Sequence, residues 1–413
     1  MIKKIKTEHL RPGVFIDRFG NDWFHHPFLF NHKLIKNQLC IDRMIAWGVK
    51  YAYIDTDRGC DVEGERYRRK PEPVPEPAEE IDFIDEVEEV EPLFTHVPFH
   101  EEIVEAKEIR AKAGNVIHRL LDDVRDGNEI DIDATHDLVV DMDKSVCRNK
   151  DALLLLMRMR NKDEYTFMHS VSVGALLIAF CRSIGLDGDA AREIGLGGML
   201  HDVGKMAVPL AILNKPSALT DSEFSIIKQH SLYCRDILEK MDYVPETAAV
   251  IACQHHERFD GTGYPYNLRG SEISPAAQMA SIVDVFDAIT ADRCYHKGMD
   301  QVDALRKIYG WRSSHFNAKL VQHFIRCVGI YPPGTVVRLA SRRIGVTLEN
   351  TDNLLKPIVR VVYDAGQDWA ITPKDIDLSR EDPETGDRIV SYESLKRWRI
   401  DPFKVLEVGG KLM

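Results

Sequence analysis

Residues 253–265 read CQHHERFDGTGYP, with two adjacent histidines, an acidic residue and a turn that contains two glycines. Neighbouring side chains on a helix point about 100° apart, so one buried face rarely needs both imidazoles. A metal site can use both, provided that ligands from other segments surround the end of the helix. The stretch therefore predicts a metal site whose remaining ligands lie elsewhere in the chain.

Further histidines and aspartates occur at intervals through the middle of the chain. They lie in MHSVS, HDVGK, KQH and SIVDVFDA, and with the adjacent pair the set is His169, His201, Asp202, His230, His255, His256 and Asp284. Imidazole and carboxylate ligands together suit iron, manganese, zinc or nickel better than calcium or magnesium. Seven ligands are too many for one tetrahedral ion but suit two metals that share a bridging aspartate, a geometry that holds a nucleophilic water and clamps a phosphate. A lone histidine such as His118 or His136 is expected to be an ordinary surface or core residue.

The composition fits a globular chain of about two or three domains. Of its 413 residues 44% are apolar, and no apolar run is long enough to cross a membrane. No signal-peptide core is visible, and the eight cysteines include no CxxC pair, so a reducing cytoplasm is the expected location. Residues 71–92 hold ten acidic residues and no Lys or Arg, which accounts for most of the net charge of −12. The sequence therefore predicts no basic surface for duplex nucleic acid.

Changes in residue pattern along the sequence predict a multidomain chain. GVFID and WGVKYAYIDT indicate strands near the N-terminus, the residues after 101 have helical periodicity, and GTVVRLASRRIGVTLEN indicates strands beyond 330. The expected parts are a small α+β N-terminal domain (1–69), an acidic Pro/Glu-rich linker (70–100), connecting helices (101–150), a mainly α-helical catalytic domain (151–328) and a small β-rich C-terminal module (329–413).

Three separated motifs, HDVGK, QHHERFDGTGYP and DVFDAITADRCY, resemble the HD-GYP group of the HD phosphohydrolase superfamily over about 150–325. The start TEHLRPGVFID resembles the domain that often precedes HD-GYP domains in bacterial proteins. The resemblance implies an HD-type catalytic domain that hydrolyses cyclic di-GMP to pGpG and onward to GMP. Two readings compete with it: a non-catalytic cyclic di-GMP receptor, and an HD hydrolase of another nucleotide or cyclic dinucleotide.

The resemblance also implies a role for each ligand. Asp202 would bridge two divalent metals, with His169, His201 and Asp284 on one metal and His230, His255 and His256 on the other. Iron or manganese is expected, with zinc, nickel or cobalt as alternatives.

Three cations are candidates for contact with a phosphate. Lys205 follows the HD pair and could neutralise a phosphate oxyanion or steady a bridging hydroxide, although a surface lysine is the alternative. Arg293 matches a phosphate-binding arginine, with a structural salt bridge as its alternative. Lys297 lies beside the position, His296 here, at which the family carries a basic residue.

The glycine-rich turn is expected to shape the site. Gly261 and Gly263 allow a tight loop that folds back over the metals, and Tyr264 could line the substrate groove or belong only to a well-made turn. Some family members carry a glutamate one turn before the first histidine and hold a third metal, but this chain has Tyr165 there, so two metals are expected. Expected partners are GGDEF-type signalling proteins and a second copy of the chain, paired through 101–160.

Overall fold

The computed structural model describes most of the chain outside the acidic linker. The described residues are 2–19, 33–35, 38–46, 50–62, 65–66, 97–128, 132–158, 165–215, 219–241, 243–291, 298–367, 369–382, 385–393, 398 and 405. The expected linker at 70–100 lies outside them except for its last four residues. None of the helices in this part of the chain combines the length and apolarity that a membrane crossing requires.

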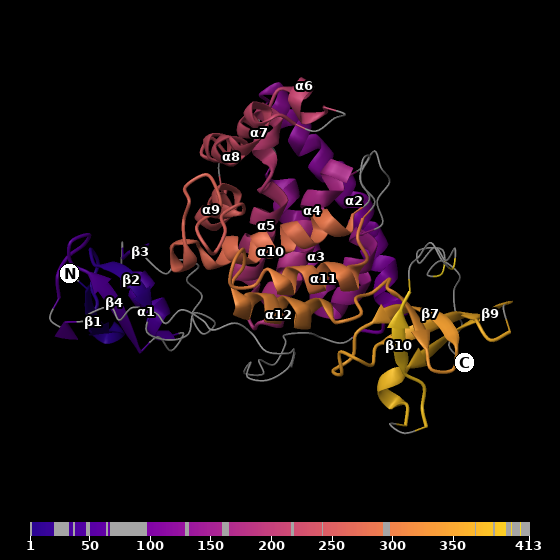
Figure 1. Ribbon diagram of the computed structural model, residues 1–413. Coiled ribbons are helices and arrows are strands. Elements are labelled where there is room, and N and C mark those ends of the chain that lie inside the picture. The colour runs from indigo at the N-terminus through magenta and orange to yellow at the C-terminus, as the bar shows by residue number, and fades with distance from the viewer. Residues whose placement is uncertain are drawn as a thin grey trace.

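The N-terminal part folds as a small antiparallel sheet with one helix, as the alternating sequence predicts. Its elements are β1 (Ile2–Lys6), β2 (Phe15–Phe19), β3 (Lys33–Leu34), α1 (Gln38–Ala46), β4 (Tyr51–Asp55) and β5 (Glu65–Arg66), in the sheet order β3-β2-β4-β1-β5. Ile5, Ile16 and Ile54 point to one face and form a core of their own with Ile41 and Met44 of α1. In Figure 1 this part, in indigo, lies to one side of the helical body.

The described residues from Phe99 to Val328 are mainly helical. Its α-helices are α2 (Phe99–Asp126), α3 (Asp133–Met157), α4 (Tyr165–Ser183), α5 (Gly188–Leu200), α6 (Leu210–Leu213), α7 (Asp221–Lys228), α8 (His230–Leu238), α9 (Glu246–Gln254), α10 (Pro275–Thr290), α11 (Gln301–Gly310) and α12 (Ala318–Val328). Local signals begin several of them: the Asp187 side chain accepts a bond from the amide of Ala190 to cap α5, and Thr220 and Glu223 form a capping box on α7. One hydrophobic core runs through α2 to α5 and α8 to α12.

Glycines bring α4 and α5 unusually close together. A Cβ at Gly174 would lie 2.9 Å from the carbonyl oxygen of Gly195, and a Cβ at Gly198 would lie 3.0 Å from Cα of Gly174. Only glycine fits at such distances, so these residues set the spacing of the two helices. His169 lies on α4 and His201 immediately follows α5, so this packing also sets the distance between the two imidazoles.

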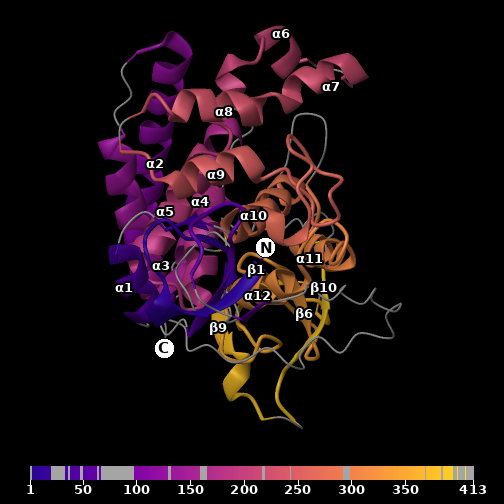
Figure 2. The same ribbon diagram turned by 90° about the vertical axis from the view of Figure 1, so that its left-hand side faces the viewer.

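The C-terminal part, predicted to be a small β-rich module, is a five-stranded antiparallel sheet. Its strands are β6 (Val336–Leu339), β7 (Arg343–Glu349), β8 (Ile358–Asp364), β9 (Trp369–Asp377) and β10 (Ile389–Tyr392), in the order β10-β6-β7-β8-β9. Figure 1 and Figure 2 both place it against one end of the helical body.

Buried polar contacts attach this sheet to α3. Asn149, which interrupts the helical backbone of α3, donates to a carboxylate oxygen of Glu349 at 2.8 Å. Asp151 accepts a bond from the amide of Asn350 at 2.6 Å, and Leu348 contributes to the helical core. The structure therefore confirms the predicted fold class, a mainly helical domain with a small sheet domain before it and a β-rich module after it.

Candidate metal centre

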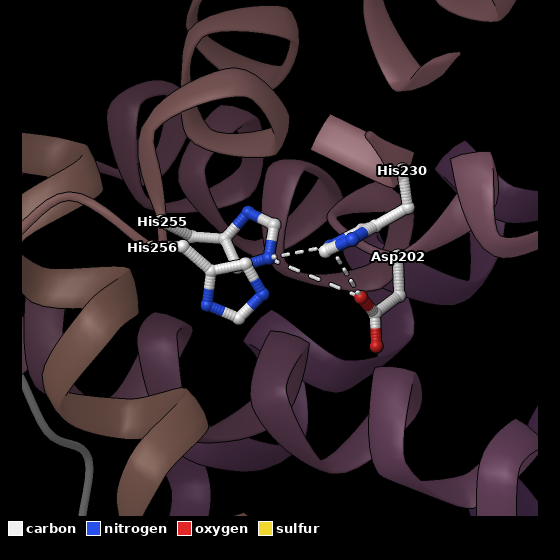
Figure 3. Close-up of side chains that lie close together, drawn as sticks. All are labelled: Asp202, His230, His255 and His256. Atoms are coloured by element: carbon white, nitrogen blue, oxygen red, sulfur yellow. Dashed lines mark hydrogen bonds and ion pairs between the residues drawn. The ribbon is translucent and has the colours of Figure 1, made fainter. Parts of the chain in front are cut away.

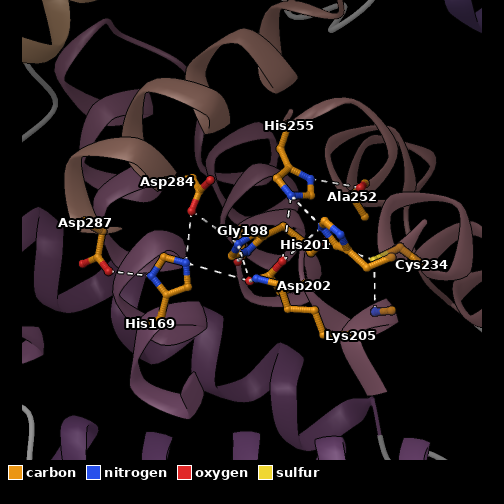
Figure 4. A network of polar contacts seen from close by, with 12 residues as sticks. His169, Gly198, His201, Asp202, Lys205, Cys234, Ala252, His255, Asp284 and Asp287 are labelled. Carbon is orange, nitrogen blue, oxygen red and sulfur yellow. Dashed lines mark hydrogen bonds and ion pairs between the residues drawn. The ribbon is translucent and has the colours of Figure 1, made fainter. Parts of the chain in front are cut away.

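Five segments of the helical body bring the predicted ligands together. His169 comes from α4, His201 and Asp202 from the turn after α5, His230 from the start of α8, His255 and His256 from the end of α9, and Asp284 from α10. Figure 3 and Figure 4 show that these side chains point toward a common centre. In three overlapping groups the candidate ligand atoms lie within 4.8 Å of one another: Asp202, His230, His255 and His256; His169, His201 and Asp202; and His201, His255 and Asp284.

The glycine of HDVGK explains how α8 reaches this centre. A Cβ at Gly204 would lie 2.1 Å from the carbonyl oxygen of His230 and 2.5 Å from the amide nitrogen of Cys234. The Cys234 thiol also donates to the carbonyl of His201 at 3.1 Å and accepts from the amide of Gly204 at 3.1 Å. The backbone of α8 therefore packs directly on the turn that carries His201 and Asp202.

Gly204→Ala should separate these two segments. We expect the added methyl group to cost about 1–3 kcal/mol of stability, because neither backbone can yield without disturbing the core. The same shift should reduce the metal content of the purified protein. Thermal unfolding and elemental analysis measure both effects, and Gly310→Ala, where a Cβ would meet no atom within 4 Å, is the matched control. A Gly204→Ala protein with wild-type stability and metal content would contradict this account of the packing.

The hydrogen bonds of the imidazoles leave their other nitrogens free to bind a metal. The Nδ1 atoms of His201, His230 and His255 lie 2.7, 2.7 and 3.0 Å from the carbonyl oxygens of Gly198, Ile227 and Ala252. Each Nδ1 must donate to its carbonyl, so in the neutral ring each Nε2 carries a lone pair.

These lone pairs converge. The Nε2 atoms of His230 and His255 lie 3.4 Å apart, and Nε2 of His230 lies 3.4 Å from Oδ1 of Asp202. Nε2 of His201 and Oδ1 of Asp202 are buried without a hydrogen-bond partner. Buried acceptors that face one another are costly unless a cation lies between them. The residues present therefore fit a divalent metal.

Burial keeps three imidazoles of the centre uncharged. It lowers the pKa of His230 and of His255, and it lowers the pKa of His256 to about 3. These three imidazoles are therefore neutral at pH 7, which is the form that binds a metal.

His169 differs from the other imidazoles in its carboxylate contacts. Its Nε2 lies 3.0 Å from Asp284, and its Nδ1 lies 2.6 Å from Asp287 (Figure 4). Burial alone would lower the pKa of His169, but the two carboxylates outweigh it and raise the pKa to about 9. Burial likewise opposes ionisation of Asp284, yet contact with His169 holds the pKa of Asp284 well below its usual range.

Metal binding should therefore release a proton from His169. In the metal-free protein His169 stays protonated until the pH passes about 9, so its ion pairs stabilise the fold fully below about pH 6.5 and are lost as the pH rises through 9. A ligand histidine must be neutral, so the apparent metal affinity should rise about tenfold per pH unit from pH 7 toward 9 and then level off. Competition with a chelator across this range measures the affinity. An affinity that does not change with pH would contradict a protonated His169.

Lys205 and the glycine-rich turn border the centre. Lys205 forms an ion pair with Oδ2 of Asp202. Gly261 has a φ of +83°, whereas Gly263 is needed for space, because a Cβ there would lie 2.3 Å from the amide nitrogen of Arg258. The Tyr264 ring lies over His256, with centroids 4.7 Å apart. The loop therefore does fold back over the predicted ligands.

Three of the sequence-based expectations cannot be placed fully. Arg293 and Lys297 lie outside the described residues, and only the backbone of Tyr165, which begins α4, is described. Their contact with a phosphate and the choice between two and three metals therefore stay predictions.

Sequence reasoning missed two supporting carboxylates. Asp287 receives a bond from Ser172 at 2.6 Å as well as its contact with His169. Glu257, directly after the two histidines, is buried and accepts bonds from the amides of Tyr266 and Leu268, which fixes the loop. The signal for Asp287 was its position three residues after Asp284, which puts both on one face of a helix.

Two protein families match parts of the chain. Residues 148–320 match the HD domain family, and residues 2–135 match a domain of unknown function (DUF3391). The cyclic di-GMP phosphodiesterase PA4108 of Pseudomonas aeruginosa is 38% identical over 402 residues, which are 96% of this chain and 94% of that protein.

Two further relatives match only part of their own length. The cyclic di-GMP phosphodiesterase response regulator RpfG of Xanthomonas campestris is 30% identical over 54% of this chain and 59% of that protein. The 3′3′-cGAMP-specific phosphodiesterase 1 of Vibrio cholerae is 36% identical over 36% of this chain and 34% of that protein. The near full-length match to PA4108 and the HD domain match confirm the resemblance drawn from the motifs. The chain therefore belongs to the HD-GYP cyclic di-GMP phosphodiesterases of the HD phosphohydrolase superfamily.

Proposed function

We propose that this protein is a metal-dependent phosphodiesterase that hydrolyses cyclic di-GMP to pGpG and then to GMP. The observation that carries the proposal is the set of converging imidazole lone pairs around Asp202, which belongs to two of the three ligand groups. The near full-length relative PA4108, itself named a cyclic di-GMP phosphodiesterase, supports the choice of substrate.

Two divalent metals would share Asp202. His169, His201 and Asp284 would hold one metal, and His230, His255 and His256 the other. Iron or manganese is our first expectation, with zinc, nickel or cobalt as alternatives, because imidazole-rich sites with carboxylates accept all of them. When bound, such a pair of ions activates water and offsets the charge of a phosphodiester. His255 also lies close to His201 and Asp284, so the division of ligands between the metals is itself a proposal.

The chain's own residues supply positioning and charge. Lys205 is held at the shared carboxylate by its ion pair with Asp202, where its ammonium can offset charge on a bound phosphate. Asp287 holds the His169 ring in one orientation and one tautomer. Tyr264 and Gly263 close the site beside His256, and Arg293 and Lys297 remain our predicted contacts to the phosphodiester.

Two other functions compete. A 3′3′-cGAMP phosphodiesterase is favoured by the Vibrio cholerae relative, although the match spans only 36% of this chain. A non-catalytic cyclic di-GMP receptor would be expected to have lost a ligand, whereas all seven candidate side chains are present and grouped.

One chromatographic assay separates these functions. Protein of known metal content is incubated with cyclic di-GMP or with 3′3′-cGAMP, with added Mn²⁺ or anaerobically with Fe²⁺. We expect pGpG and then GMP from cyclic di-GMP, and no product from the His201→Ala/Asp202→Ala double variant. Binding without turnover at two metals per chain would indicate the receptor, and a higher kcat/KM for 3′3′-cGAMP would indicate the other substrate.

The cellular location and the partners of the protein are also proposals. We place the protein in the cytoplasm, with GGDEF-type signalling proteins and a second copy of the chain as partners. The division into five parts stays a prediction as well, and its boundary at 150–151 falls within α3. Co-purification and the oligomeric state in solution test the two partners.

A further inference from the structure

A cation lies between two aromatic rings just outside the metal centre. Nζ of Lys228 lies 5.3 Å from the centroid of the Phe224 ring, one helical turn earlier on α7, and 5.8 Å from the centroid of the Tyr264 ring. Tyr264 in turn lies over His256. His256, Tyr264, Lys228 and Phe224 therefore form a row of contacts that runs from a predicted metal ligand to α7.

The position of α7 keeps this row close to the centre. Gln229 alone separates Lys228, the last residue of α7, from His230, the first residue of α8. Figure 1 and Figure 2 both show α7 beside α8, at the end of the helical body away from the C-terminal sheet. Lys228 is therefore held within two residues of the predicted ligand His230.

The side chains of Phe224 and Lys228 on α7 are both accessible to a ligand. Phe224 is 47% exposed, which is unusual for so large an apolar ring. Within the described part of the chain, Lys228 forms no ion pair with any carboxylate, and its ammonium lies over the two aromatic rings. An exposed aromatic face and a cation side by side suit a nucleotide, because a base stacks on the ring while a phosphate pairs with the ammonium.

We propose that Phe224 and Lys228 form the subsite for the half of cyclic di-GMP that is not being cut. This inference rests on the proposed function. The substrate is a ring with two phosphodiesters on opposite sides, so when one lies at the metal centre the other guanylate must lie farther out. Phe224 stacks on the guanine of that second guanylate, and Lys228 contacts its phosphodiester. Tyr264 lies between this subsite and the centre.

The proposed subsite predicts that a cyclic dinucleotide and a small phosphodiester respond differently to its loss. Cyclic di-GMP is large enough to occupy the metal centre and α7 together. A small diester such as bis(4-nitrophenyl) phosphate has no second phosphate and should use only the metal centre. Loss of the subsite should therefore affect KM for the dinucleotide and not hydrolysis of the aryl diester.

The test compares Phe224→Ala and Lys228→Met with wild type in the metal-loaded full-length protein. We expect each substitution to raise KM for cyclic di-GMP about tenfold, as for the loss of one stacking or phosphate contact, with kcat little changed. Phe224→Tyr and Lys228→Arg should restore most of the affinity. Tyr243→Ala and Lys240→Met remove an exposed aromatic ring and an exposed cation elsewhere on the same body and should leave KM unchanged.

The outcomes separate this inference from the function on which it rests. A wild-type KM for cyclic di-GMP in both α7 variants overturns the subsite, and so does an equal loss of activity on both substrates, because the residues would then act on the metal centre. A wild-type protein that does not cut cyclic di-GMP contradicts the proposed function instead. In that case the dissociation constant of the dinucleotide decides: a tenfold increase in the α7 variants supports the subsite, and equal or absent binding overturns it.

Discussion

Asp202→Asn is expected to abolish hydrolysis of cyclic di-GMP, with a loss of about a thousandfold or more in kcat/KM. The carboxylate belongs to two ligand groups: Oδ1 lies 3.4 Å from His230, and Oδ2 lies 3.3 Å from His201 and forms an ion pair with Lys205. An amide of nearly the same shape keeps one oxygen but removes the negative charge that two divalent ions would share. Loss of several kcal/mol of charge stabilisation corresponds to a thousandfold or more in rate.

The same substitution should also empty the centre. Elemental analysis should find fewer metals per chain in Asp202→Asn, whereas Asp137→Asn, an exposed aspartate of α3, serves as the matched control and should keep both metals and activity. Because Lys205 loses its ionic partner, its ammonium should be less well positioned in the variant. A metal-loaded Asp202→Asn protein that retains a tenth of wild-type activity would refute the shared role of this carboxylate.

The sequence could locate the centre because several of its residues, among them His201, His230 and His255, lie at helix ends with recognisable neighbours. HDVGK predicts a metal-binding turn, but its glycine is explained only by the structure, where α8 packs against Gly204. Adjacent His255 and His256 likewise indicate a metal site, and the helix that ends at Gln254 lets both reach it. What the sequence could not give is the contact between His169 and Asp287, since these residues are 118 positions apart on different helices.

The fold was predictable where local pattern decides it and less so where distant segments meet. The sequence pattern predicted some strands of each sheet, and three- and four-residue spacing predicted α2 through Ile109, Ala113 and Ile117. The attachment of the C-terminal sheet depends on Asn149 and Glu349, two hundred residues apart, and no local pattern reports such a pair. Periodicity also did not reveal that α2 and α3 share one core with the helices that carry the ligands.

Asp287→Asn is expected to weaken metal binding by about 10–100-fold while leaving the protein folded. The carboxylate receives Nδ1–H of His169 and the hydroxyl of Ser172, both at 2.6 Å, so it fixes the imidazole in the tautomer that presents Nε2 to the centre. Partners of this kind typically change metal affinity or activity by that factor. Asparagine removes the charge and can present its NH₂ group to the ring, which would favour the wrong tautomer. Chelator competition and elemental analysis measure the loss.

A purely structural role for Asp287 would give a different result, and Asp143 provides the comparison. Each of these aspartates is 2% exposed, but Asp143 pairs with Arg182 and Arg192, away from the predicted ligands. Asp143→Asn should lower the melting temperature and leave metal affinity unchanged. Asp287→Asn should lower metal affinity in addition to any loss of stability, and it should also lower the pH at which metal binding levels off, because the pKa of His169 falls when one of its two carboxylates is neutralised. If Asp287→Asn loses only stability, as Asp143→Asn does, Asp287 is a packing residue and the orientation of His169 must come from Asp284 alone.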